Sequence, residues 1–107
     1  MAWILIVVAG LFEIAMAYSL KLSNGFSSLL PSVGVVVFGV LSFGLLSLAL
    51  KNLEVGTAYA VWTGIGAVGT AALGIVLLGE DASALKIISI VLILAGVIGL
   101  NLAGGGH

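Results

Sequence analysis

Four long apolar stretches, separated by short polar breaks, limit the folds that this chain can adopt. They cover about residues 3–20, 29–50, 55–78 and 86–103. Each is long enough for a membrane-spanning helix, which needs about 17–25 residues. Because lipid offers the backbone no hydrogen bonds, such segments must be helical. The sequence therefore predicts an all-α fold, a single domain of four transmembrane helices over residues 1–107, located in the cell (inner or plasma) membrane.

The composition excludes several classes of soluble protein. Hydrophobic residues make up 63% of the chain and charged residues 7%, against about 45–50% and about 25% in soluble domains. Three basic residues offer no patch for nucleic acid, and the absence of cysteine together with one histidine, His107, predicts no metal or cofactor. Residues 104–106, all glycine, and His107 are interpreted as a frayed or non-native end.

Glu13 lies midway along the first apolar stretch, where a charge is costly. Insertion scales put that cost at roughly 2.5–3.5 kcal/mol for a charge at the centre of a membrane helix. Its neighbours one turn away are Ala9, Gly10, Met16 and Ala17, and none of them can pair with a carboxylate. The partner must come from another helix, another chain or solution, so Glu13 is predicted to be a functional residue.

The third stretch carries an aromatic face. Tyr59, Trp62, Thr63 and Gly66 lie on one side of the predicted helix. The two rings can form a wall that attracts a cation, worth about 2 kcal/mol when desolvated, although Tyr59 also fits an interfacial aromatic belt. Gly64 and Gly66 indicate either a hinge or a place where helices pack closely.

Ser42 is a polar side chain in the middle of the second stretch. Its predicted depth in the bilayer is similar to that of Glu13, so its hydroxyl can donate a hydrogen bond to the carboxylate. The alternative is a hydrogen bond to a carbonyl of its own helix. The sequence does not decide between these two partners.

The lysines are balanced between the two sides of a four-pass chain. Lys21 and Lys86 fall on one side, and Lys51 and the free amino terminus fall on the other. Since lysine and arginine in short loops normally set orientation, this balance predicts insertion in both orientations and an antiparallel dimer of two identical chains. Two copies would give eight helices around two Glu13 side chains.

The fourth stretch offers a contact surface for such a dimer. Ala95, Gly99 and Ala103 are spaced by four residues, and Gly96 lies alongside them. Small residues in this pattern let two helix backbones approach closely, although small residues are also common in any membrane helix. We predict that Ala95, Gly96 and Gly99 contact the second copy.

Several motifs together resemble one known family. Residues 12–13 (Phe-Glu), 24–26 (Asn-Gly-Phe) and 31–34 (Pro-Ser-Val-Gly) match its first helix, first loop and second helix. The most specific stretch is residues 56–66, Gly-Thr-Ala-Tyr-Ala-Val-Trp-Thr-Gly-Ile-Gly. Over nearly its whole length the chain resembles the small multidrug resistance family of proton-coupled exporters.

Within that family, the chain is most similar to the branch that exports guanidinium. Gly10, Phe12 and Ser42 carry this resemblance, with the third-helix motif. Two positions depart from the branch, which usually has Trp where this chain has Met16 and Lys where it has Asn101. Met16 replaces an indole donor with a flexible, polarizable side chain.

The resemblance implies a transporter rather than an enzyme. It would be an antiporter that exchanges protons for small organic cations, guanidinium-type compounds favoured, with quaternary ammonium drugs as the alternative substrates. Its partner would be a second copy of the chain or a related subunit. Two alternative functions from other classes stay open: a proton-translocating rotor subunit and a structural helix bundle. Both Glu13 side chains would bind substrate or protons, in a pocket expected to include Gly10, Met16, Ser42, Tyr59, Trp62 and Thr63.

Overall fold

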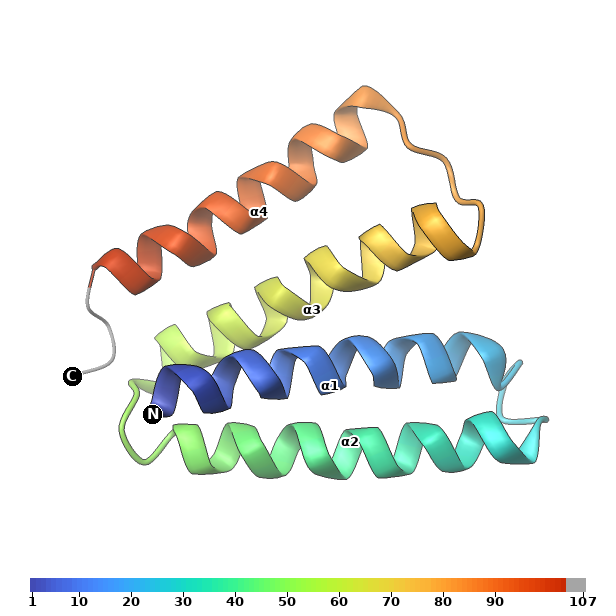
Figure 1. The fold of residues 1–107 in the computed structure, drawn as a ribbon, viewed down its shortest axis with the longest axis horizontal. Helices are drawn as coiled ribbons and strands as arrows, with labels where there is room; N and C mark the ends of the chain where they lie inside the picture. The colour runs from blue at the N-terminus through green and yellow to red at the C-terminus, as the bar shows by residue number, and fades with distance from the viewer. Residues whose placement is uncertain (104–107) are drawn as a thin grey trace.

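The computed structural model describes residues 1–103 and contains four helices there (Figure 1). They are α1 (Ala2–Leu22), α2 (Leu29–Ala49), α3 (Val55–Leu77) and α4 (Ala84–Leu102). All four are long and apolar enough to cross a membrane, which confirms the predicted all-α, four-span fold. The predicted frayed or non-native end, the glycine run 104–106 with His107, lies outside the described residues.

Local chemistry fits the starts of α4 and α2. Ser83 caps α4, because its hydroxyl accepts a hydrogen bond from the Lys86 amide at 3.3 Å. The helix begins at Ala84, two residues before the expected start at residue 86, since the capping residue directly precedes it. Pro31 occupies the first turn of α2, where a missing amide hydrogen leaves no intrahelical bond unmade.

The loop between α1 and α2 is folded around a buried serine. The Ser23 hydroxyl donates to the Leu20 carbonyl at 2.7 Å and accepts from the Phe26 amide at 3.1 Å. Asn24, Gly25 and Phe26 all have positive φ angles, between 49° and 71°. This left-handed turn reverses the chain within a few residues and sets α2 alongside α1 (Figure 1).

The four helices form a single flat layer. In Figure 1, α1 lies between α2 and α3, while α4 contacts α3 alone and diverges from it toward the loop that joins them. The shortest extent of the layer is 16 Å against 42 Å and 34 Å for the others, little more than the roughly 10–12 Å diameter of one helix. Both faces of the layer are thus open, and one chain cannot enclose a path around Glu13.

The core gathers where α1 begins, α2 ends and α3 begins. Its fully buried members include Ile6 and Ala9 of α1, Ala49 of α2, and Ala58 and Val61 of α3. Several are small residues, which let membrane helices approach closely. By contrast, α4 has no buried residue within the described chain.

Candidate functional site

Glu13 lies on α1 where this helix packs against α3. Its carboxylate is so close to the Gly66 backbone that a Cβ atom at position 66 would overlap Oε1. Within residues 1–103, Oε1 is buried without a hydrogen-bond partner, and the one ion pair there joins Lys86 to Glu80 instead. Buried polar atoms in native proteins are nearly always hydrogen-bonded. The exception at Glu13 therefore marks an oxygen that can receive a proton or a cation.

Ser42 ties three helices together, and both hydrogen bonds predicted for it are wrong. Its hydroxyl donates to the Ala9 carbonyl of α1 at 2.6 Å and accepts from the Trp62 indole nitrogen of α3 at 2.9 Å. It donates neither to Glu13 nor to its own helix. The three groups form a buried polar bridge four residues, or about one turn, before Glu13.

We expect Ser42→Ala to destabilise the fold while leaving Glu13 chemically unchanged. Losing the hydroxyl leaves the buried Trp62 N–H without an acceptor, which costs about 1–3 kcal/mol. The unfolding free energy in mixed detergent and the emission maximum of the tryptophans would measure the change. Ser47→Ala is the matched control, because Ser47 is exposed on the same helix. Equal stability of the two variants would contradict a structural bridge at Ser42.

Tyr59 and Trp62 of α3 lie close together but differ in exposure, and their role as a wall that attracts a cation stays a prediction. Tyr59 is 55% exposed whereas Trp62 is 4% exposed. Their ring centroids are 5.4 Å apart, and the Phe43 ring of α2 lies 5.1 Å from Trp62 on another side. Phe43 was not predicted, although it follows Ser42 directly in the sequence. Trp62 is thus a packed residue, and Tyr59 is the ring available at the surface of the layer.

Met16 faces α2 rather than the Glu13 carboxylate. Its sulfur would lie 3.2 Å from a Cβ atom at Gly39 of α2, whereas Glu13 points toward α3. The flexible thioether fills the space above the Gly39 backbone. Within one chain, Met16 belongs to the α1–α2 contact, and its role in a substrate pocket stays a prediction for the assembled protein.

Two other predicted pocket residues also have partners within the chain. Gly10 permits close approach of α3, since a Cβ atom there would lie 2.6 Å from Ile65 Cγ2. The Thr63 hydroxyl donates to the Tyr59 carbonyl of its own helix. These contacts explain why each residue is small or hydroxyl-bearing, and substrate contact at Gly10 or Thr63 stays a prediction.

Gly64 and Gly66 lie where neighbouring helices meet α3. A Cβ atom at Gly64 would be 2.6 Å from Val97 Cγ2 of α4, and one at Gly66 would meet Glu13. The α3 helix runs unbroken through both positions. Close packing, one of the two interpretations of these glycines, is confirmed. A hinge at the same positions stays a prediction.

The comparisons with known proteins fit this arrangement. A sequence model described as Small Multidrug Resistance protein matches residues 1–93. The chain belongs to the small multidrug resistance family. The guanidinium exporter of Yersinia pseudotuberculosis is 62% identical over 103 residues, covering 96% of this chain and 99% of that protein. The guanidinium exporters of Escherichia coli K12 and Salmonella typhimurium LT2 are 55% and 54% identical over the same length, covering 98% of each.

Membership of the small multidrug resistance family confirms the predicted resemblance. Together with four membrane-spanning helices, it makes this chain a multi-pass inner-membrane protein of a transporter family. The rotor-subunit and structural-bundle alternatives are set aside, because neither belongs to that family.

Proposed function

We propose that this chain is half of a proton-coupled antiporter that exports guanidinium-type cations. The observation that carries the proposal is the buried Glu13 Oε1, which has no hydrogen-bond partner in residues 1–103. A carboxylate in the middle of a membrane helix lowers stability, so its presence there indicates a function. The names of the relatives, all guanidinium exporters at 54–62% identity, supply the class of substrate.

Competition between protons and cations at Glu13 would couple their movements. A protonated carboxyl group has lost the charge that attracts a cation, so each ligand expels the other. If the site opens to one side of the membrane at a time, proton entry from one side drives cation release to that side. Lowering the pH on the loading side should therefore reduce cation uptake from that side.

The chemistry of Glu13 favours guanidinium over a quaternary ammonium ion. Guanidinium is planar and its N–H groups can donate to both oxygens of one carboxylate, as arginine does. A quaternary ammonium ion has no N–H to donate. The exposed ring of Tyr59 supplies an aromatic face for either cation, so the discrimination rests on Glu13.

The proposed transporter contains two chains, because one flat layer leaves Glu13 unenclosed. The α4 helix exposes Ala95, Gly96 and Gly99, and nothing in residues 1–103 lies within 4 Å of a Cβ atom built at either glycine. This open strip of small residues supports an antiparallel contact with a second copy. Reporter fusions at the carboxyl terminus should detect both orientations, and a single fixed orientation would contradict the antiparallel dimer.

Transport by the purified chain in liposomes tests the function. We expect guanidinium and a substituted guanidinium that keeps its N–H groups both to move faster than tetraethylammonium. We also expect a pH gradient that is acidic on the receiving side to drive guanidinium to that side against its concentration gradient. Movement of none of the three cations, or guanidinium flux indifferent to the pH gradient, would contradict the proposal.

A further inference from the structure

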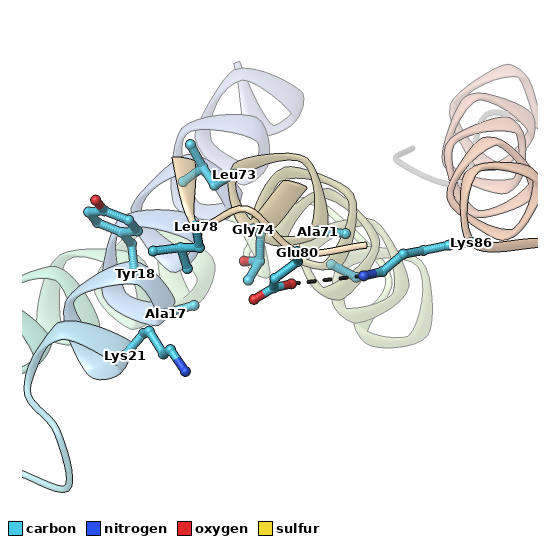
Figure 2. Close-up of a pocket in the computed structure, with 11 residues that line it drawn as sticks. Ala17, Tyr18, Lys21, Ala71, Leu73, Gly74, Leu78, Glu80 and Lys86 are labelled. Atoms are coloured by element: carbon cyan, nitrogen blue, oxygen red, sulfur yellow. Dashed lines mark ion pairs between the residues drawn. The ribbon is translucent and has the colours of Figure 1, made fainter. Parts of the chain in front are cut away.

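A cavity of about 400 Å³ lies at the end of the layer where α1 and α3 end and α4 begins (Figure 2). Its lining includes Lys21, Glu80 and Lys86, together with the hydroxyl-bearing residues Tyr18 and Thr70. Glu13 does not line it. Two of the three basic side chains in the whole sequence therefore meet at one hollow that cation export does not explain.

The residues that line this cavity carry one more positive than negative charge, since Lys21 and Lys86 are set against Glu80. Glu80 Oε1 lies 3.9 Å from the Lys86 ammonium, which also donates to the Asp81 carbonyl at 2.8 Å. This pair neutralises itself, while Lys21 has no ion-pair partner within residues 1–103. Each lysine ammonium has three N–H donors, so most of the donors that line the cavity remain available. A net positive hollow of this kind attracts an anion.

Glu80 lines the cavity and is held against Gly74. Its amide donates to the Gly74 carbonyl at 2.9 Å, and its carboxylate covers Gly74 so closely that a Cβ atom there would overlap Oε1. Figure 2 shows Glu80 between the two lysines, with its dashed ion pair to Lys86 and with Lys21 on the other side. The carboxylate thus pairs with Lys86 and not with Lys21.

The charged rim of this cavity lies where the spanning helices end, while its lining continues along α3 as far as Ala67 in the middle of the span. Lys21 is in the last turn of α1, Leu78 caps the end of α3, and Lys86 is in the first turn of α4. These ends of spanning helices meet the membrane surface, where the phosphate groups of lipids lie. Basic pockets between transmembrane helices bind lipid headgroups, and the volume is within the range of small-ligand sites.

We propose that this cavity binds the phosphate group of an anionic phospholipid, with Lys21 as its main cationic contact and Lys86 as the second. This site is separate from the proposed cation site, because its lysines attract anions whereas Glu13 attracts cations. Glu80 weakens the site, since it neutralises Lys86 and repels the phosphate. Removal of Lys21 and removal of Glu80 should consequently have opposite effects.

Native mass spectrometry of the purified full chain with defined lipids tests the proposal. Wild type should retain phosphatidylglycerol in preference to phosphatidylethanolamine at equal mole fractions. Lys21→Gln should reduce the retained phosphatidylglycerol about fivefold, the effect of losing one lysine near a lipid surface, and Lys21→Arg should retain it. Glu80→Gln should increase it. Lys51→Gln is the control, because Lys51 is exposed at the opposite end of the layer.

Two further measurements separate lipid binding from other causes. Circular dichroism of each variant establishes that the helices are intact, so that a lost lipid is not a lost fold. Inorganic phosphate should displace phosphatidylglycerol from wild type and should have no effect on Lys21→Gln. This pair of results would support a phosphate site. Unchanged retention in Lys21→Gln, or reduced retention in Glu80→Gln, would overturn the proposal. Inorganic phosphate bound without any preference between the two lipids would also overturn it, since the site would then be one for free anions.

Discussion

Replacing Glu13 by Gln is expected to abolish proton-coupled guanidinium transport, down to the rate of liposomes without protein. Gln has nearly the same volume as Glu, but its side chain carries no charge and does not take up a proton near neutral pH. Its amide cannot attract a cation or exchange it for a proton. The fold should persist and resist unfolding better, because a costly charge at mid-membrane has been removed. Guanidinium flux driven by a pH gradient measures the loss of transport, and the unfolding transition of the same variant measures its stability.

Glu54→Gln is the matched control for this loss. Glu54 precedes α3 in an exposed loop, outside the spanning segments. It carries the same charge as Glu13 but has no buried oxygen, so its removal should leave coupled transport near the wild-type rate. Coupled transport that survives in Glu13→Gln would rule out this carboxylate as the exchange site.

Gly66→Ala should impair transport by displacing the Glu13 carboxylate. The added Cβ atom would overlap Oε1, which sits at the end of a flexible side chain. Glu13 can relieve the overlap by moving, so the fold is retained while the binding geometry is lost. Overpacking costs about 1–3 kcal/mol. If about 1.4 kcal/mol of that cost destabilises the guanidinium-bound state, the affinity for guanidinium falls about tenfold. Tryptophan fluorescence titrated with guanidinium measures the affinity.

Gly69→Ala separates this effect from a general disturbance of the α1–α3 contact. Gly69 lies one turn further along α3, and a Cβ atom there would overlap Ile14 Cδ1, the side chain next to Glu13 in the sequence. The crowding is of the same kind, but it involves no carboxylate. We expect guanidinium affinity to fall much further in Gly66→Ala than in Gly69→Ala. An equal loss would assign the effect to helix packing alone.

The spans could be predicted from the sequence because lipid imposes one simple condition on them. Any stretch of about 20 apolar residues must satisfy its own backbone, and only a helix does so within one segment. The cost of burying Glu13 likewise follows from its sequence position. The helix ends differed by up to two residues, as at Ala84, because capping by Ser83 is a local choice that hydropathy does not record.

Side-chain partners could not be predicted, since they depend on how the helices are rotated against each other. Ser42 lies in the middle of α2, as predicted, yet its acceptor proved to be the Ala9 carbonyl. No pattern of residue types identifies a main-chain acceptor on another helix. The same limit explains Met16, which lies one turn from Glu13 in sequence but faces Gly39 of α2.

Proton release on cation binding tests the central claim most directly, namely that protons and guanidinium compete for Glu13. Guanidinium would be added to weakly buffered protein in detergent while a pH indicator records released protons over a range of pH values. We predict release that is greatest where Glu13 is half protonated and is absent in Glu13→Gln. Guanidinium binding at that pH with no proton released from wild type would contradict competition at this carboxylate.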